Sequence, residues 1–300
     1  MFPLNRRKKR ASLIKVSIAL FAVSALCVIA SRAYANVGDL YVTDLASGSV
    51  IVYAPDGTST TFTSGLVSPQ GIAFDQNFNL YVVDAGDGGT GNGTIFKYNI
   101  VTKAQSTLIT GLSNPIGLAL HGADLIVSEN GMDRVTRVPT DGISPPSVFQ
   151  LLPTPMGLSS HFFNNNTFSY IANGPEVLRV GSDGTNMDID PNDGSRATEV
   201  STITIQAIPT PTPGEVVFVS TDAGQITTLV NGVKQAPVAT GIMDPRGMAF
   251  RPGPINTTDA GDLFVANTAG GQILDVKKNA TPIPFATPGA PNYMVFQTGT

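Results

Sequence analysis

The sequence predicts an all-β protein, a six-bladed β-propeller of four-stranded blades in which the last strand of the chain completes the first blade. Three observations lead to this fold class. A strand–turn–strand unit recurs six times, Gly (31 residues) and Pro (22 residues) are abundant while charged residues make up only 13% of the chain, and the two chain ends match different strands of one unit. Many short strands joined by tight turns have this composition.

The clearest mark of the repeat is a short apolar strand that ends on a polar residue. It occurs at 40–44, 80–84, 125–129, 169–173, 217–221 and 263–267. Successive copies start 40, 45, 44, 48 and 46 residues apart. A four-stranded propeller blade has roughly 40 to 50 residues, so each copy predicts the second strand of one blade.

A third strand follows each copy. These strands are expected at 50–53, 95–98, 135–138, 177–180, 226–229 and 273–276. Four of them run into Asp-Gly or Asn-Gly, at 56–57, 141–142, 183–184 and 231–232. These dipeptides supply the positive φ angles of tight hairpins, so a short fourth strand such as 60–63 should come next.

The innermost strand of a unit begins with Pro-x-Gly. The motif stands at 69–71, 115–117, 155–157 and 245–247, with a degenerate copy, Pro291-Asn292-Tyr293, near the end of the chain. The unit before Val217 has no such copy, and we take 201–206 as its inner strand. Since residues 294–296 match an inner strand and 40–44 a second strand, the two should pair and close a ring, which removes the exposed sheet edges. An open β-solenoid would not need such offset ends.

The repeat resembles the NHL-type propeller repeat. The residues that carry the resemblance are Pro-x-Gly-Ile-Ala-Phe-Asp at 69–75, Leu-Tyr-Val-x-Asp at 80–84, Ile-x-x-Tyr at 95–98 and the Asp-Gly turns. More broadly, the chain is similar to the superfamily of gluconolactonase-like (senescence-marker-like) six-bladed propellers. The resemblance covers nearly all of residues 36–300 and implies the fold, but this scaffold carries both enzymes and binding proteins.

Residues 1–35 have the pattern of a cleaved signal peptide. A basic cluster at 6–10 precedes an apolar stretch at 16–30, and Ala33-Tyr34-Ala35 is a small-x-small cleavage signal. The alternative is a retained anchor helix, but the apolar stretch is shorter than the roughly 20 residues that span a bilayer. We therefore expect export to the periplasm or the extracellular space, with residues 36–300 as one propeller domain.

Cleavage would change the charge of the chain. All seven charged residues of 1–35 are basic, so 11 of the 18 basic residues and all 22 acidic residues would remain, a net charge of −11. Such a chain is a poor partner for nucleic acids or anionic lipids. Its one cysteine, Cys27, lies in the leader, so the domain should fold without disulfides. We expect a monomer that binds a small molecule, a glycan or a protein, without a membrane and without a cofactor apart from a possible structural calcium.

The variable residue of Pro-x-Gly is the predicted ligand site, at the mouth of the central channel. The positions hold Gln70, Ile116, Met156, Arg246 and Asn292. Gln70, Arg246 and Asn292 could bind an anionic or sugar-like ligand, with the arginine as the charge and the amides as donors and acceptors. The alternative is that Arg246 pairs with a neighbouring acid such as Asp244.

The resemblance to gluconolactonase-like enzymes implies a divalent metal at this mouth, held by Asn and Asp at the variable position of two blades and by a Glu of an early inner strand. Only Asn292 can be carried over as such a ligand, and a hard cation needs several carboxylate or carbonyl oxygens. The sequence therefore favours a non-catalytic binding propeller. A metal-dependent lactonase or related hydrolase is the alternative.

A second cation site is conceivable in an acidic turn. Asp188, Asp190, Asn192 and Glu199 stand at positions 1, 3, 5 and 12 of a calcium-loop pattern, but the required Gly is one place late and no flanking helices are expected. The turn predicts at most weak structural calcium binding.

The remaining polar residues are expected to be structural. Asp44, Asp84, Glu129, Asn173 and Asn267 end the second strands, and one copy in each blade suggests that they satisfy backbone N–H groups at the turn after their own strand rather than form a catalytic cluster. The two histidines, His121 and His161, are expected to lie in surface turns after inner strands. No motif for a nucleophilic serine is present, and the domain has no cysteine.

Overall fold

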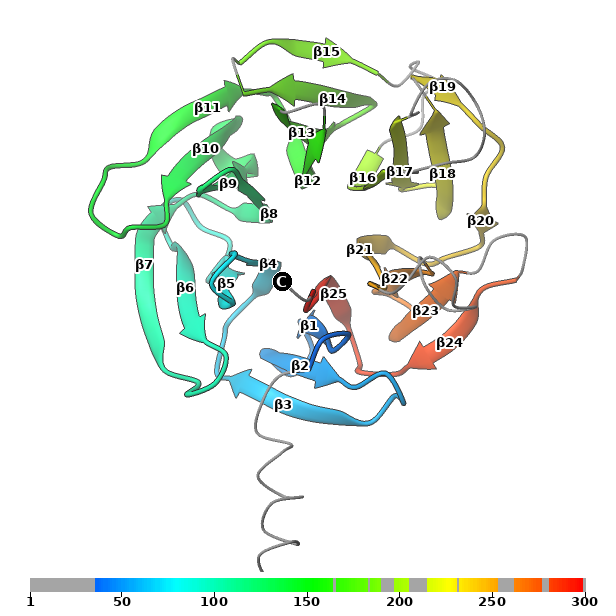
Figure 1. Cartoon of the computed structure of the whole chain (residues 1–300), viewed down its shortest axis with the longest axis horizontal. Coiled ribbons are helices and arrows are strands. Elements are labelled where there is room, and N and C mark those ends of the chain that lie inside the picture. The colour runs from blue at the N-terminus through cyan, green and yellow to red at the C-terminus, as the bar shows by residue number, and fades with distance from the viewer. Residues whose placement is uncertain are drawn as a thin grey trace, which may run out of the picture. The chain divides into compact units, whose positions relative to one another are not determined.

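Six four-stranded antiparallel sheets surround a central axis, as Figure 1 shows. The computed structural model of the chain describes residues 36–163, 166–182, 184–189, 197–204, 215–230, 232–252, 262–276 and 281–298. The predicted all-β, six-bladed propeller is confirmed. The only helix in these described ranges is a 3-10 turn, η1 (Asn130–Met132).

The first three blades follow the predicted strand pattern. Blade 1 consists of β25 (Pro291–Phe296), β1 (Leu40–Asp44), β2 (Ser49–Tyr53) and β3 (Ser59–Ser64). Blade 2 consists of β4 (Pro69–Phe74), β5 (Asn79–Asp84), β6 (Gly93–Asn99) and β7 (Gln105–Leu112). Blade 3 consists of β8 (Pro115–His121), β9 (Asp124–Glu129), β10 (Arg134–Pro139) and β11 (Ser147–Leu151).

The other three blades repeat it, with blade 5 the least regular. Blade 4 consists of β12 (Pro155–Phe163), β13 (Asn166–Asn173), β14 (Glu176–Gly181) and β15 (Asn186–Asp188). Blade 5 consists of β16 (Ala197–Thr204), β17 (Glu215–Thr221), β18 (Gln225–Val230) and two short outer pieces, β19 (Val233–Lys234) and β20 (Ala239–Thr240), which both pair with β18. Blade 6 consists of β21 (Pro245–Phe250), β22 (Leu263–Asn267), β23 (Gln272–Val276) and β24 (Ile283–Ala286).

The ring closes as the offset chain ends predict. Strand β25 pairs with β1 in antiparallel register, with Tyr41 opposite Val295, so the last strand of the chain is the innermost strand of the first blade. In Figure 1, β25 lies between β1 and the axis. The inner strand of blade 5 starts four residues earlier than the predicted 201–206, at Ala197, because Ala197 pairs with Thr221 where Pro pairs in the other blades.

Every inner strand has a register shift just after its first residue, and this bulge explains the Pro-x-Gly motif. Pro69 lies opposite Asp84, while Ile72, three residues later, lies opposite Val82. A Cβ on Gly71 would stand 2.5 Å from the backbone N of Leu118, and one on Gly247 would stand 2.5 Å from Cα of Tyr293. Glycine is required there because the inner strands of neighbouring blades touch backbone to backbone.

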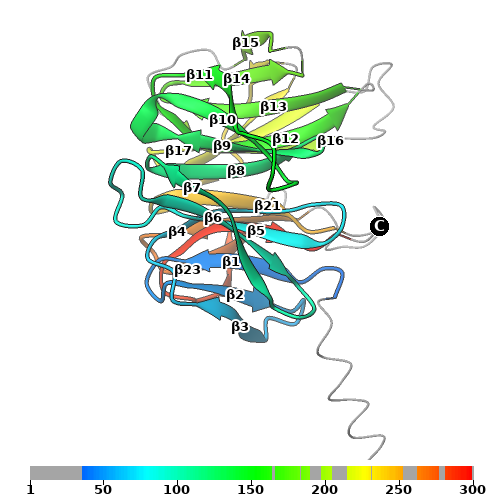
Figure 2. The ribbon, with the colours of Figure 1, turned by 90° about the vertical axis from the view of Figure 1, so that its left-hand side faces the viewer.

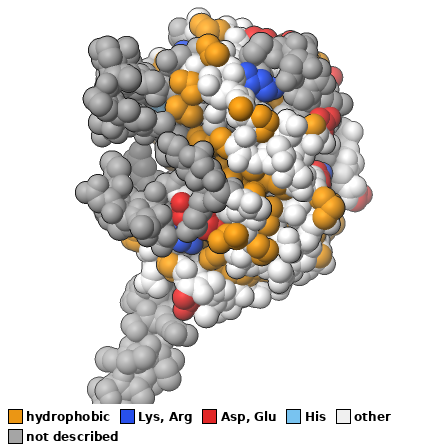
Figure 3. All heavy atoms as spheres, turned by 90° about the vertical axis from the view of Figure 1, so that its right-hand side faces the viewer, with side chains coloured by type: hydrophobic (Ala, Val, Ile, Leu, Met, Phe, Trp, Pro, Cys, Tyr) orange, Lys and Arg blue, Asp and Glu red, His pale blue; other side chains and the backbone are white. Residues whose placement is uncertain are grey.

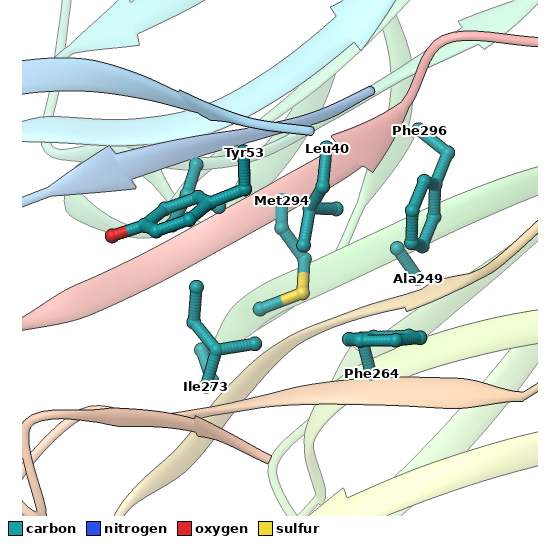
Figure 4. Packing of buried hydrophobic residues seen from close by; sticks show 9 residues of the cluster. Leu40, Tyr53, Ala249, Phe264, Ile273, Met294 and Phe296 are labelled. Carbon is teal, nitrogen blue, oxygen red and sulfur yellow. The ribbon is translucent and has the colours of Figure 1, made fainter. Parts of the chain in front are cut away.

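The core lies between blades rather than in one central mass. One buried cluster combines Leu40 and Met294 of blade 1 with Phe264 and Ile273 of blade 6, and Figure 4 shows these side chains filling the space between the two sheets. Four further clusters join the other successive blades from blade 2 to blade 6. Each sheet buries both faces against its neighbours, which explains the almost unbroken apolar second strands.

The side view in Figure 2 shows the strands of blades 1 to 4 crossing the ring from one face to the other. We call the face where the inner strands begin the Pro-x-Gly end and the opposite face the far end. Figure 3 shows a flank of the molecule on which hydrophobic and uncharged side chains outnumber charged ones. Among the described residues, no helix has the length and hydropathy that crossing a bilayer requires. The predicted leader, 1–35, lies outside the described ranges.

Candidate functional site

The polar residues that end the second strands fix the segments that connect the blades. In four blades, a side-chain oxygen of this residue accepts a hydrogen bond from a backbone N–H just before the inner strand of the same blade, whereas Oδ1 of Asn267 is buried without a hydrogen-bond partner. The pairs are Ser68 N to Asp84 Oδ1 (2.8 Å), Ser113 N to Glu129 Oε2 (2.9 Å), Thr154 N to Asn173 Oδ1 (3.1 Å) and Ala290 N to Asp44 Oδ1 (2.7 Å). These four residues have the predicted structural role. However, the N–H groups that they bind precede the inner strand, whereas the sequence predicts N–H groups in the turn after the second strand. Two of them also bind the turn after their own strand: Asp84 accepts from the N–H of Gly86, and Asp44 accepts from the hydroxyl of Ser47.

Gln70 and Asn292, two of the three predicted ligand residues, lie together at the Pro-x-Gly end. Asn292 is fully buried, and its Nδ2 donates to Gln70 Oε1 (2.8 Å) and to the carbonyl of Pro69 (3.0 Å). Asn292 Oδ1 is buried without a hydrogen-bond partner. The amides therefore join blade 1 to blade 2 and leave one buried acceptor open.

Arg246, the third predicted ligand residue, pairs with Asp244, which is the alternative given for it in the sequence analysis. Its Nε lies 3.0 Å from Asp244 Oδ2, and both side chains are about one-third exposed. Arg246 therefore has a carboxylate partner on its own chain. No contact among the described residues joins it to the Gln70–Asn292 pair, and its ligand role stays a prediction.

The predicted calcium turn falls largely outside the described residues. Asp190 and Asn192 lie there. Asp188 ends β15, and Glu199 lies in β16, where its backbone is opposite Ser220. In the described part of the chain, no three His, Cys, Asp or Glu side chains gather closely enough to hold a metal ion.

The central channel contains a cavity of about 410 Å³. Its walls come from five inner strands, β4, β8, β12, β21 and β25, and start two or three residues after each Pro, so the cavity extends from there toward the far end. Most of the lining is apolar, including Phe74, Leu120 and Phe250. Among the described side chains of this lining, the polar ones are Ser159, Ser160, Tyr293 and Thr298, and none is charged; the side chains of 198–204 in β16 lie outside the described part of the structure.

The prediction that both histidines lie in surface turns is wrong. His121 is the last residue of β8, and 4% of it is exposed. His161 lies within β12 and is half-buried. The inner strands extend further than the sequence pattern indicates, so both residues belong to strands.

His121 belongs to a buried hydrogen-bond chain that reaches the cavity. Its Nδ1 lies 2.7 Å from the hydroxyl of Ser169, and that hydroxyl lies 2.9 Å from the hydroxyl of Ser160. Ser160 lines the cavity. The ring of Phe149 packs against the imidazole with the ring centroids 5.1 Å apart. Burial lowers the pKa of His121, the charge of Arg137 lowers it further, and Asp124 opposes the shift, so the imidazole is neutral at pH 7.

The hydrogen-bonded serines are visible in the sequence as a departure from the repeat, which the motifs do not reveal. Ser160 lies opposite Ser169 in the ladder of blade 4. The same pair of positions is apolar in four of the other five blades: Phe74 and Leu80, Leu120 and Leu125, Phe250 and Leu263, and Phe296 and Leu40. Blade 4 thus replaces two large apolar side chains by two hydroxyls.

A comparison of the sequence with protein-family models finds no match, and neither does a comparison with curated proteins. Solved structures do match the fold. A chain of a nidogen/laminin complex has a TM-score of 0.65 at 15% identity, over 86% of this chain and 97% of that one. A catalytically inactive virginiamycin B lyase from Staphylococcus aureus, solved with quinupristin, has a TM-score of 0.55 at 16% identity, over 77% and 74%. These likenesses support the six-bladed propeller fold.

Proposed function

We propose that this chain is an exported, NHL-type recognition propeller that binds an uncharged, largely apolar ligand in its central channel. The observation that carries the proposal is the cavity of about 410 Å³, whose lining is apolar apart from a few hydroxyls. Small-molecule sites have this composition, with a few polar groups that fix the orientation of the ligand.

The ends of the channel fit this role. At the far end, Ser160 belongs to the lining. At the Pro-x-Gly end, the hydrogen bond from the buried Asn292 to Gln70 joins blades 1 and 2. The sequence-based expectation of an anionic ligand at Arg246 loses support, because Asp244 already neutralises this guanidinium.

The metal-dependent lactonase is less well supported by the described residues. Such a reaction requires several carboxylate or carbonyl oxygens around one ion, and the described side chains of the lining include no carboxylate. The neighbouring solved structures include both a nidogen/laminin complex and lyases, so the fold does not decide between binding and catalysis.

The test is a ligand screen by thermal unfolding of the chain 36–300. Methyl esters and lactones of four to ten carbons are compared with the corresponding acids, with monosaccharides and with tripeptides. We expect the uncharged apolar compounds to raise the melting temperature by several degrees at saturation, because a ligand that binds only the folded state stabilises it. Equal responses to the esters and the acids would contradict the proposal.

A matched pair of variants places the ligand in the cavity. Val295 lines the cavity from β25 and is half-buried. Val295→Phe should fill the space and abolish the ligand-induced shift, whereas Val295→Thr keeps the volume and should retain it. Calcium, zinc and manganese are added in a parallel series. A metal-linked rise in melting temperature together with lactone turnover would favour the hydrolase instead.

A further inference from the structure

The serine pair of blade 4 departs from the repeat at the wall of the cavity. A buried apolar pair such as Phe296 and Leu40 stabilises blade 1, and two hydroxyls at these positions contribute less packing. Local departures from the rules of a scaffold are expected where function requires them. A reason other than packing is therefore needed for Ser160 and Ser169.

The hydrogen-bond chain allows a proton to move away from the cavity. Each hydroxyl carries one proton, so when Nδ1 of the neutral His121 accepts from Ser169, the Ser169 oxygen accepts from Ser160. The lone pairs of the Ser160 oxygen are not used in this arrangement of the hydrogen bonds, and Ser160 lines the cavity. Phe149 and Ser169 hold the imidazole from two sides. A nucleophile, a relay and a base held in position are the elements of an activated serine.

We propose that Ser160 is a nucleophile that accepts the acyl group of an uncharged carboxylic ester bound in the cavity. Its Oγ forms a bond to the carbonyl carbon as the bond from that carbon to the alcohol oxygen breaks. The proton of Ser160 passes to Ser169, whose own proton passes to His121 Nδ1. A proton then returns from His121 through the same hydrogen bonds to the departing alcohol. Water releases the acid by the same steps, and Ser160 is regenerated.

The inner strand supplies a donor for the developing oxyanion. Strand β12 is an edge strand of its sheet, paired with β13 on one side only. Every second N–H of an edge strand is directed away from its neighbour, here toward the channel. One such N–H therefore stands at Ser160 or at the residue next to it, where it can stabilise negative charge on the carbonyl oxygen.

The lining defines the substrate class. The described side chains of the lining carry no charge, and beside them a free acid or an amine would bury its charge without a partner. The apolar walls fit a short aliphatic or aromatic ester. The inference rests on the proposed use of this cavity as a ligand site and adds chemistry to it.

The test uses an alkyl fluorophosphonate carrying biotin, incubated with the chain 36–300 and followed by peptide mass spectrometry. Attack by Ser160 forms the Oγ–P bond, breaks the P–F bond and releases fluoride, while the proton passes to His121. We expect a single adduct on Ser160, absent from Ser160→Ala and retained in Ser106→Ala, whose serine is exposed on the outer strand β7. No adduct at Ser160, or equal labelling of Ser159, would overturn the inference.

A second variant distinguishes the loss of the base from a loss of folding. In His121→Asn, the amide stands near the position of Nδ1 and keeps the bond to Ser169 without a basic nitrogen. It should unfold at nearly the same temperature as the parent and be labelled about 100-fold more slowly, the usual contribution of a general base. Unchanged labelling would overturn the inference. A chain that binds esters in the screen but is not labelled would retain the proposed function and lose only the reactive serine.

The pH profile gives a third readout. The groups that face His121 are Asp124 of β9, Arg137 of β10 and Ser169 of β13, and His161 lies beside Ser160 on β12. Because the pKa of His121 is lowered chiefly by burial, the base stays neutral to a lower pH than an ordinary histidine does. Labelling should stay constant from pH 8 to about pH 6.5 and fall only at lower pH. A decline that begins above pH 7 would contradict this base.

Discussion

Blade 2 and blade 4 have the same four strands in the same order, and they differ in chemistry at one cross-strand pair. Phe74 faces Leu80 in blade 2, whereas Ser160 faces Ser169 in blade 4. Both pairs lie where the inner strand approaches the far end, and Leu80 and Ser169 are both fully buried. The comparison teaches that a polar residue repeated in the blades marks the scaffold, while a polar residue that breaks the repeat marks a candidate site.

Introducing the serine of blade 4 at the equivalent position of blade 2 should have the largest effect on the free energy of unfolding. Leu80→Ser removes a fully buried side chain and leaves a hydroxyl without the partners that Ser169 has, so the free energy of unfolding should fall by about 4 kcal/mol. The matched change Ser169→Ala removes two hydrogen bonds but little volume and should cost about 1 kcal/mol. Urea denaturation measures both. Similar losses in the two variants would mean that the serine pair belongs to the packing of the scaffold.

The second largest loss of stability is expected at a polar residue that belongs to the repeat. Glu129 is fully buried and accepts from Ser113 N, Arg134 Nε and the hydroxyl of Thr136. Glu129→Ala should destabilise the fold by about 3 kcal/mol, because it leaves these donors without an acceptor. Glu129→Gln keeps an acceptor and should cost less. Neither variant should slow the labelling of Ser160, and a loss of labelling in Glu129→Gln would contradict the separation of scaffold and site.

The same carboxylate predicts the acid sensitivity of the scaffold. Burial raises the pKa of Glu129, but the hydrogen bonds from Arg134, Thr136 and Ser113 together outweigh it, so the net pKa is lowered. Its stabilisation is therefore present above the pKa of the unfolded chain, about 4.3, and is lost as the pH falls through the lower folded value. Measured from pH 7 to pH 3, the free energy of unfolding of Glu129→Gln should fall less steeply than that of the parent.

Repetition also explains which parts of the structure the sequence could predict. The second and third strands follow from patterns with six copies, and the pairing of β25 with β1 follows from the offset of the two chain ends within that repeat. Blade 5 lacks the Pro-x-Gly motif, and its inner strand was placed four residues too late. Ala197 holds the place of the proline, but no local pattern identifies it.

The site was harder to predict because its residues come from different blades. His121 ends β8, while Ser160 and Ser169 lie on β12 and β13, so their contact depends on how two sheets pack. A nucleophilic-serine motif is a local sequence pattern, so it does not describe a contact between two blades. The aligned copies do contain the information, since Ser169 stands where Leu40, Leu80 and Leu125 stand in other blades.

A third and smaller effect concerns the strand that closes the ring. Met294 is buried between β1 and blade 6, whereas the neighbouring Val295 is half-buried and lines the cavity. Met294→Ala should lower the free energy of unfolding by about 2 kcal/mol. Val295→Ala should cost less than about 1 kcal/mol, because less apolar area leaves a buried environment. Equal costs, measured by urea denaturation, would mean that the two faces of β25 are packed alike.

The smallest expected effect is that of Arg246→Ala at the Pro-x-Gly end. The ion pair with Asp244 is about one-third exposed on both sides, and such pairs contribute roughly 0 to 1 kcal/mol. The variant should unfold within about 0.5 kcal/mol of the parent in urea, and the difference should shrink further in 0.5 M salt. Asp244→Asn is the matched control, since it leaves Arg246 in place and frees its charge. If Arg246 itself receives an anion, Asp244→Asn should respond to acetate or phosphate in the thermal screen and Arg246→Ala should not. If neither variant responds, this end of the channel is scaffold, and the polar chemistry of the ring is concentrated at the serine pair of blade 4.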